Sequence, residues 1–224
     1  MRENIRKNAL DAKRSPEDVR FILVTKTVPA EKILQAASCG VADFGENRVQ
    51  ELLAKKKEMF GKPGVESFRW HMIGHLQTNK VRQVLMEVAL IHSLDRTELA
   101  EEIERQAALK KIKSVDCLIQ INSSAEASKF GMRPEEAFGF VEKLTGPAIQ
   151  VRGLMTIGPL TEDPDQIRRA FRLTKDLRSE LRKKFPRKDW GILSMGMSGD
   201  YSIAIEEGAN LVRIGSAVFG ERRQ

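Results

Sequence analysis

The architecture of this 224-residue chain is indicated most clearly by one segment, Phe21-Ile22-Leu23-Val24-Thr25-Lys26-Thr27-Val28-Pro29. Its first four residues are apolar and two of them are β-branched, which predicts a buried strand. Pro29 ends the strand pattern and permits a helix to begin directly after it. Lys26 is thereby predicted at the carboxyl end of the first strand, the edge at which α/β proteins bind ligands. A partly desolvated lysine there is a nucleophile toward carbonyl groups, although a solvated lysine at a strand end is the commoner case.

Similar apolar runs recur along the chain, and longer segments with helical periodicity separate them. The predicted strands are Phe21–Thr25, Val41–Phe44, Arg69–Ile73, Ala89–Leu94, Val115–Asn122, Val151–Ile157, Gly191–Met195 and Leu211–Ile214. The predicted helices cover residues 30–39, 47–60, 78–87, 96–111, 134–145, 164–184 and 199–207, and another precedes the first strand near Ile5–Arg14. Strands that alternate with helices favour a parallel sheet, and eight strands close a (β/α)₈ barrel. The alternative is an open, doubly wound sheet, which periodicity does not distinguish from a barrel.

Composition limits the class of protein. No Pro/Gly/Ser-rich linker divides the sequence, so residues 1–224 are expected to form a single domain. The 41% hydrophobic and 31% charged content is typical of a soluble globular protein. No apolar run approaches the roughly 18 residues that span a bilayer, and the first residues lack signal-peptide features, so a cytoplasmic location is expected. Cys39 and Cys117 are predicted to be small core residues in a reducing cytosol, with one disulfide as the alternative.

The net charge of +7 is concentrated between Arg168 and Lys188. An apolar stripe at helical spacing runs through this region, made of Ile167, Ala170, Phe171, Thr174, Leu177 and Leu181. A solvated helix face is the preferred interpretation, because no aromatic residues are arranged there for base stacking. No specific nucleic-acid partner is therefore expected, and a binder of anions or nucleic acid remains the alternative class.

Helix-start signals support the alternating pattern. Asn47, with Gln50 three residues later, resembles a capping box after the second strand. Asp163-Pro164 places an N-cap and an N1 proline before the long basic helix. Ser198-Gly199-Asp200 is expected to open the helix after the seventh strand.

Two late segments are the best candidates for an anion site, Leu193-Ser194-Met195-Gly196-Met197-Ser198-Gly199-Asp200 and Arg213-Ile214-Gly215-Ser216-Ala217. In (β/α)₈ barrels, phosphate groups are commonly held by the loops after strands 7 and 8. Glycines let backbone N–H groups approach the oxygens, and Ser198 and Ser216 add hydroxyl donors. Arg213 interrupts an apolar strand, so its charge needs either a structural partner or a ligand.

Other chemistries are weakly supported. His71 and His75 lie four residues apart, but the first is predicted in a strand, where that spacing covers roughly 13 Å. A shared metal ion with His92 is therefore not favoured. The sequence has no GxSxG, GxGxxG or GxxxxGK[ST] motif. A lysine after strand 1 and a phosphate site after strands 7 and 8 instead suit pyridoxal 5′-phosphate, because these strands are neighbours in a closed barrel.

Several ordered motifs resemble those of the pyridoxal phosphate homeostasis proteins (the YggS/PROSC family), from about Ser15 to the end of the chain. The quoted segments are Arg14-Ser15-Pro16-Glu17, Val24-Thr25-Lys26-Thr27, Phe44-Gly45-Glu46-Asn47, Trp70-His71-Met72-Ile73-Gly74-His75-Leu76-Gln77-Thr78-Asn79-Lys80, Ile119-Gln120-Ile121-Asn122, Gly153-Leu154-Met155, Leu193-Ser194-Met195-Gly196-Met197-Ser198 and Val212-Arg213-Ile214-Gly215-Ser216-Ala217-Val218-Phe219-Gly220. The resemblance implies a single barrel like the N-terminal domain of alanine racemase. It also implies pyridoxal 5′-phosphate as cofactor, held as a covalent aldimine (Schiff base) on Lys26.

The resemblance assigns roles to further residues. It implies phosphate contacts at Ser198, Gly215 and Ser216, Arg213 facing the pyridine nitrogen, and Asn47 lining the pocket. Met195 is included among the expected cofactor-binding residues. The sequence departs from the family pattern at Thr25, Ser216 and Gly199, where serine, threonine and an acidic residue are common. The first two departures keep a hydroxyl group, and the third is expected to loosen the strand 7 loop.

The expected function is pyridoxal phosphate binding in vitamin B6 homeostasis, with little or no turnover. An arginine at the ring nitrogen leaves the ring a weak electron sink. Tyr201, the one tyrosine of the sequence, is expected on a helix in a packing role, and the chain ends soon after the eighth strand without a racemase's second domain. The enzyme alternative is a pyridoxal-phosphate-dependent amino-acid racemase. A monomer is expected, with apo forms of pyridoxal-phosphate enzymes as candidate recipients and no membrane partner.

Overall fold

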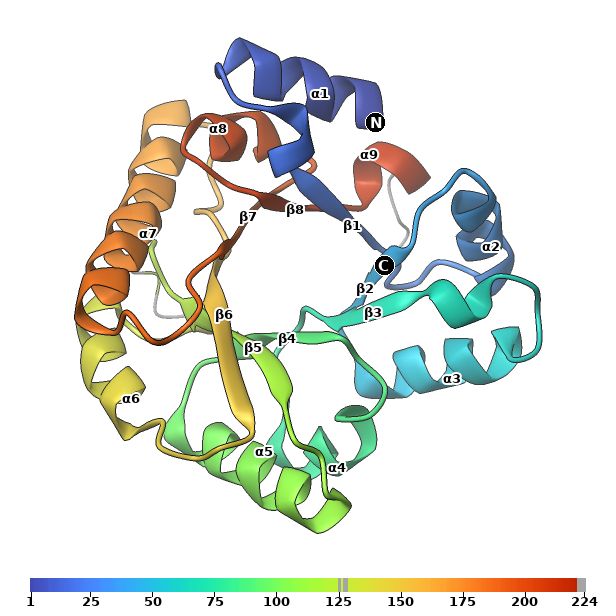
Figure 1. Ribbon diagram of the computed structural model, residues 1–224. Helices are drawn as coiled ribbons and strands as arrows, with labels where there is room; N and C mark the ends of the chain where they lie inside the picture. The colour runs from blue at the N-terminus through green and yellow to red at the C-terminus, as the bar shows by residue number, and fades with distance from the viewer. Residues whose placement is uncertain (125, 127–128, 221–224) are drawn as a thin grey trace.

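Eight parallel strands close into a barrel, with the helices around its outside (Figure 1). The computed structural model describes residues 1–124, 126 and 129–220. Neighbouring strands follow chain order and β8 pairs with β1, which confirms the barrel and excludes the open sheet. The strands are β1 (Arg20–Val24), β2 (Asp43–Glu46), β3 (Arg69–Met72), β4 (Leu90–Leu94), β5 (Val115–Ile121), β6 (Ile149–Thr156), β7 (Ile192–Met197) and β8 (Leu211–Ile214). The last four residues of the expected 1–224 domain lie outside the described range.

Helices follow the strands as the periodicity predicts. They are α1 (Arg2–Asp11), α2 (Ala30–Ser38), α3 (Val49–Met59), α4 (Val81–Val84), α5 (Thr97–Lys110), α6 (Ala137–Lys143), α7 (Pro164–Lys184), α8 (Tyr201–Glu206) and α9 (Ser216–Phe219). Short 3₁₀ turns cover Pro16–Asp18, Val65–Ser67, Thr78–Lys80 and Pro134–Glu136. The N-terminal α1 lies beside α8 (Figure 1). In the part of the chain that the structure describes, no helix has both the length and the apolar composition of a membrane span.

The inside of the barrel has an apolar layer and a polar layer. The apolar layer consists of Ile22, Leu90, Leu118, Met155 and Leu211, with Ile192 packed against it. Side chains two positions apart on a strand point to the same side. One step nearer the carboxyl ends, four of these strands therefore place polar residues inside: His92, Gln120, Ser194 and Arg213, all of them buried. This polar layer forms the floor beneath the carboxyl-terminal face of the barrel.

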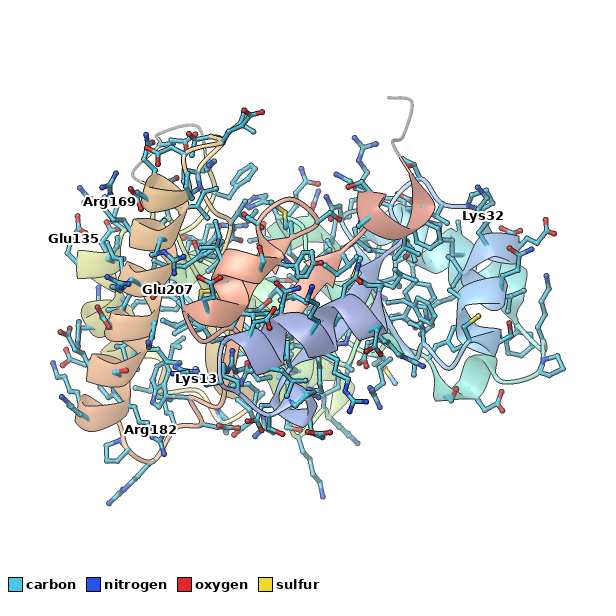
Figure 2. All side chains as sticks on the ribbon, turned by 90° about the horizontal axis from the view of Figure 1, so that it is seen from above. Lys13, Lys32, Glu135, Arg169, Arg182 and Glu207 are labelled. Atoms are coloured by element: carbon cyan, nitrogen blue, oxygen red, sulfur yellow. The ribbon has the colours of Figure 1, made fainter. Side chains whose placement is uncertain are left out.

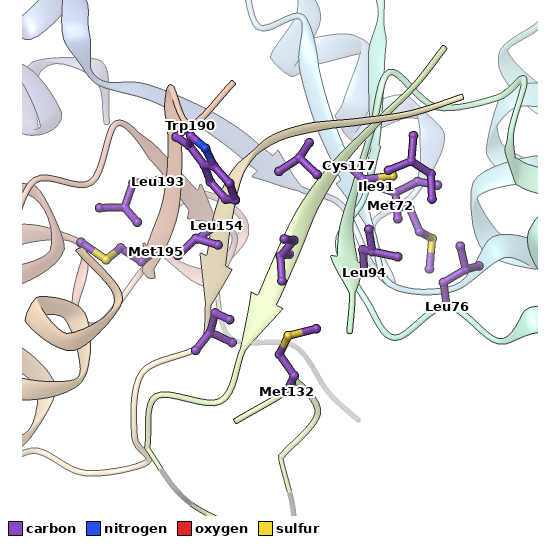
Figure 3. Close-up of a cluster of buried hydrophobic side chains, with 14 of the residues drawn as sticks. Met72, Leu76, Ile91, Leu94, Cys117, Met132, Leu154, Trp190, Leu193 and Met195 are labelled. Atoms are coloured by element: carbon purple, nitrogen blue, oxygen red, sulfur yellow. The ribbon is translucent and has the colours of Figure 1, made fainter. Parts of the chain in front are cut away.

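A larger hydrophobic core fills the space between strands and helices (Figure 3). Helix α7 buries the stripe predicted for it, so its amphipathic assignment is confirmed. Its N-cap prediction is also confirmed, because the Asp163 side chain accepts hydrogen bonds from the N–H groups of Asp165 and Gln166. Burying one face of this charged helix therefore accounts for its position on the barrel.

Part of the positive charge of α7 is neutralised within the protein. Arg168 contacts Glu206, the last residue of α8, and Glu207 directly after it, at 2.5 and 2.8 Å. Arg172 also contacts Glu207, at 2.9 Å. In Figure 2, Glu207 faces α7 while Arg169 and Arg182 extend from that helix toward the outside. The basic segment is thus a helix that packs by its apolar face and forms ion pairs beside α8. Its remaining charged face is solvated, as predicted.

Three local predictions are wrong. Strand β2 is shifted by two residues from the prediction, since it begins at Asp43 and continues through Gly45 to Glu46. The charged Glu46 fits the strand because it is buried against Lys55 and Thr25. Asn47 does not cap a helix, since the N-cap of α3 is Arg48 and no side chain caps it. Cys39 is exposed just after α2, whereas Cys117 is buried as predicted, and both are free thiols.

Candidate functional site

A cavity of about 760 Å³ opens at the carboxyl ends of the strands. It brings together six of the seven predicted site residues: Lys26, Asn47, Ser198, Arg213, Gly215 and Ser216. The remaining lining residues are Val24, Ile73, Gly74, His75, Gln120, Phe130, Ile157, Met197 and Gly199. Ligand pockets are typically about 300–1,000 Å³, so the cavity has the size of a small-molecule site.

Lys26 lies in the turn between β1 and α2, two residues beyond the end of the strand. Lys26 is exposed and lines the cavity. The next residue, Thr27, has a φ of 60°, a conformation that a β-branched residue rarely adopts. The surroundings must therefore hold this turn in place.

A buried cluster beneath the turn provides that support. Lys55 of α3 donates hydrogen bonds to the Thr25 carbonyl, to Glu46 Oε1 and to Glu51 Oε1, at 2.6, 2.7 and 2.6 Å. Thr25 Oγ1 also donates to Glu46 Oε1, at 2.6 Å. The N–H group of Thr27 donates to Glu51. The residues on both sides of Lys26 are thus held by one cluster.

Glu46 is the most deeply buried carboxyl group of this cluster. Burial raises its pKa, and the hydrogen bonds from Lys55 and Thr25 oppose that effect. Its Oε2 atom has no hydrogen-bond partner among the described residues. A buried charge that loses its partner is costly, so Lys55 and Glu46 depend on each other.

Asn47 follows β2 directly and lines the cavity together with Gly74. A Cβ atom at Gly74 would lie 2.4 Å from the Asn47 carbonyl oxygen. Glycine at this position therefore lets the loop after β3 approach the end of β2. Both residues thereby line the same cavity.

Ser198 and the start of α9 form a cluster of hydrogen-bond donors. The Oγ atom of Ser198 accepts from the N–H groups of Gly215 and Ala217, each at 3.2 Å. Ser216 is exposed at the cavity edge. The predicted loops after β7 and β8 thus meet at the cavity, which both Ser198 and Ser216 line with hydroxyl-bearing side chains.

Arg213 is buried in the barrel wall, with 4% of its surface exposed. It donates to the carbonyl groups of Ser194 and Thr156, at 2.9 and 2.7 Å, and to Ser194 Oγ at 2.7 Å. Burial lowers the pKa of Arg213 to about 10, with the negative charge of Asp200 acting in the opposite direction. The guanidinium group is therefore charged at neutral pH and faces the cavity from below.

Met195 does not join the cavity residues. It is fully buried beside Leu193 in the hydrophobic core between strands and helices (Figure 3). Strand alternation explains its position, because Ser194 points into the barrel and its neighbour must point outward. Met197 lines the cavity instead, because the alternation is interrupted before it by a register shift after Ser194 and a positive φ at Gly196.

Three of the lining side chains without a predicted site role have notable contacts or burial. His75 stacks on Phe130, with ring centroids 4.0 Å apart, and together they form an aromatic wall. Gln120 is 3% exposed, and its Oε1 atom has no hydrogen-bond partner among the described residues. Gln120 carried a usable signal, a polar residue inside an apolar strand. Phe130 carried none, because nothing in its loop predicts contact with a residue 55 positions earlier.

The sequence matches the family "Alanine racemase, N-terminal domain" over residues 1–223. It is 44% identical to a pyridoxal phosphate homeostasis protein of Aquifex aeolicus, an alignment covering 99% of this chain and 95% of that protein. A protein of the same name from Vibrio alginolyticus is 40% identical, over 93% of this chain and 89% of that one.

Solved structures agree with this assignment. PipY of Synechococcus elongatus PCC7942 with pyridoxal phosphate bound has a TM-score of 0.83 and 33% identity, covering 96% of this chain and 100% of PipY. Alanine racemase of Corynebacterium glutamicum shares the fold at a TM-score of 0.73 and 15% identity, with 100% of this chain and 61% of the racemase aligned. The chain therefore belongs to the pyridoxal phosphate homeostasis proteins, within the alanine racemase N-terminal domain family.

Proposed function

We propose that this protein binds pyridoxal 5′-phosphate in vitamin B6 homeostasis, through a Schiff base on Lys26 and with little or no turnover. One observation carries the proposal: an amine, a buried guanidinium and two serine hydroxyl groups line the same cavity, at Lys26, Arg213, Ser198 and Ser216. These groups complement the aldehyde, the ring nitrogen and the phosphate of the cofactor. The names of the relatives and the pyridoxal phosphate bound to PipY support the same assignment.

The remaining cavity residues fit an aromatic ligand. Ile73 and the His75–Phe130 stack provide apolar surface for a ring. The unpartnered Oε1 atom of Gln120 is a buried acceptor, which a ring hydroxyl group would satisfy. Asn47 contributes an amide group to the same cavity.

Each group of the protein has a defined task in this proposal. The Lys26 amine would hold the cofactor as a Schiff base at its aldehyde carbon, with the aldehyde oxygen leaving as water. The Lys55 cluster holds the turn that carries the amine. Ser198, Gly215 and Ser216 would contact the phosphate, and Arg213 would donate to the ring nitrogen.

The covalent part is tested by reconstituting the protein with pyridoxal 5′-phosphate, reducing with borohydride and mapping the modified peptide by mass spectrometry. The expected adduct is on Lys26, and Lys26→Arg should lose both the adduct and the visible absorption band. An adduct mainly on Lys80, beside a neighbouring cavity, or on Lys129, which pairs with Glu126, would contradict the assignment.

The homeostatic role is tested separately from binding. Apo forms of pyridoxal-phosphate enzymes are the proposed recipients, and the protein is proposed to act as a monomer. Loaded protein should reactivate an apo-enzyme while losing its own absorption band, and the Lys26→Arg variant should not. Sedimentation at micromolar concentration checks the monomer.

A further inference from the structure

A chain of hydrogen bonds crosses the barrel interior from Arg213 to Asp43. The Nη1 group of Arg213 donates to Ser194 Oγ at 2.7 Å. Ser194 Oγ lies 3.2 Å from His92 Nδ1, and His92 Nε2 lies 3.1 Å from His71 Nδ1. His71 Nε2 completes the chain, 3.0 Å from Asp43 Oδ1. The cavity wall is thus connected to the amino-terminal edge of the barrel, where Asp43 begins β2.

The two ends of the chain set the direction of its bonds. A guanidinium group has only donors, and a carboxylate has only acceptors. Ser194 Oγ accepts from Arg213, so its own proton is free to be donated to Nδ1 of His92. Burial, reinforced by the positive charge of Arg213, lowers the pKa of His92 well below its usual value, so the ring is neutral at pH 7.

The remaining protons follow from this neutral ring. The single proton of His92 is on Nε2 and is donated to Nδ1 of His71. His71 then carries its proton on Nε2 and donates it to Asp43. Every bond therefore runs from the positive end to the negative end, and both rings have the same tautomer.

We propose that His92 and His71 are positioning residues, whose neutral Nε2–H forms tie the Arg213 guanidinium to the Asp43 carboxylate and hold it at the cavity floor. The inference rests on the proposed function in one respect, that Arg213 faces the ring nitrogen of the cofactor. A buried guanidinium requires compensation, and the polar chain leads to a carboxylate. Burial acts against ionisation of Asp43, but hydrogen bonds from Arg69 and His71 hold its pKa well below the usual range.

The tautomers provide a test that needs no cofactor. The sequence has three histidines, so long-range ¹H–¹⁵N spectra of the cofactor-free protein contain three ring systems, and His75→Gln identifies the third. The Nε2–H form is expected for both His71 and His92 near pH 7. An Nδ1–H form, or a doubly protonated ring, at either histidine would overturn the inference.

The positioning role is tested with two ligands. One is pyridoxal 5′-phosphate, and the other is its carbocyclic analogue, in which a C–H group replaces the ring nitrogen. Ser194→Ala breaks the chain beside Arg213 and should weaken binding of the cofactor roughly tenfold, as for loss of a charge-assisted hydrogen bond, while binding of the analogue stays unchanged. Ser93→Ala is the matched control, because it removes a buried hydroxyl group next to His92 that has no partner among the described residues.

Arg213→Met separates this inference from the proposed function. If Arg213→Met weakens binding of the cofactor but not of the analogue, and Ser194→Ala has no such selective effect, the positioning role is wrong. If Arg213→Met affects the binding of both ligands equally, the proposed ring-nitrogen contact fails. The histidine tautomers then decide by themselves whether the chain of hydrogen bonds exists. Equal weakening of both ligands by Ser194→Ala would indicate a general structural defect and overturn the positioning role.

Discussion

The ammonium group of Lys55 lies 2.6 Å from the carbonyl oxygen of Thr25, the residue that precedes Lys26. Its two other hydrogen bonds go to Glu46 and Glu51, and Glu51 also accepts from the N–H group of Thr27. The turn that presents the proposed reactive amine is therefore fastened to α3 and β2 through one buried lysine. This relationship links the stability of the barrel to the position of Lys26.

Lys55→Met should destabilise the protein and slow its reaction with the cofactor. Removing the lysine leaves Glu46 buried without its charged partner, a change that typically costs about 3–5 kcal/mol of unfolding free energy. The Thr25 carbonyl also loses its donor, so the turn should become more mobile and Schiff-base formation slower. Urea unfolding measures the first effect, and stopped-flow absorbance of the folded variant measures the second.

Lys56→Met is the matched control for this prediction. Lys56 is the next residue of α3, but it is partly exposed and pairs with Glu87 at 2.6 Å. An exposed pair of this kind contributes about 1 kcal/mol or less. If both variants behaved alike, the Lys55 cluster would have no special role in holding the turn.

The donor cluster at Ser198 should provide much of the affinity for the phosphate ester. Ser198→Ala removes one hydroxyl donor to the anion, which is expected to reduce binding by roughly 1.5–3 kcal/mol. Pyridoxal, which lacks the phosphate, should bind far more weakly to the wild-type protein and be nearly insensitive to the substitution. Equilibrium titrations of both ligands check this, and equal affinities for the two would show that the phosphate lies elsewhere.

Acid should remove the stabilisation contributed by Asp43. Hydrogen bonds from Arg69 and His71, acting against burial, lower the pKa of this carboxyl group in the folded state. The unfolded chain therefore takes up a proton near pH 4 that the native protein does not, and stability falls as the pH drops below that value. The difference in unfolding free energy between wild type and Asp43→Asn should thus be largest at neutral pH and decrease as the pH falls.

Asp116→Asn controls for the loss of any carboxylate from the barrel. Asp116 is partly exposed at the start of β5 and pairs with Arg152 at 2.9 Å. Its substitution should change stability little across the same pH range, as for other surface pairs. A gap for Asp43→Asn that stayed constant from pH 3 to 7 would contradict the proposed linkage.

The architecture was predictable because its signals are local. Each strand is a short apolar run, and the stripe on α7 has helical spacing from Ile167 to Leu181. Lys26 and Arg213 could be placed at the site because each lies at or near the carboxyl end of a predicted strand. Ordered family motifs then assigned chemistry to those positions.

The unpredicted features depend on packing between distant segments. Lys55 sits in a run of three lysines, and nothing local distinguishes the buried one from Lys56 and Lys57. The spacing of His71 and His92 along the chain disfavours a shared metal ion, but it does not predict that adjacent strands bring the two rings together. Met195 was placed in the site by its motif, and strand alternation turns it away.

Turnover of amino acids should be poor. Arg213 stays protonated at neutral pH, because its pKa is lowered by burial only to about 10. A ring nitrogen that accepts from a guanidinium group is not itself protonated, so the ring withdraws electrons weakly from a substrate carbanion. Racemisation also needs an acid or base on each face of the substrate carbon. Tyr201, the one tyrosine of the sequence, is half-buried at the start of α8 against the hydrophobic core and is not among the cavity residues.

The test incubates loaded protein with L-alanine and other amino acids in deuterated water, following chiral products and α-proton exchange. Typical enzymes turn over at about 1–10³ per second. We expect racemisation and exchange rates far below that range. The Lys26→Arg variant, incubated with the same free cofactor, measures the background reaction of the cofactor in solution. Racemisation at enzymatic rates that disappeared in Lys26→Arg would mean that another side chain of this cavity, with His75 the first candidate, supplies the second acid or base.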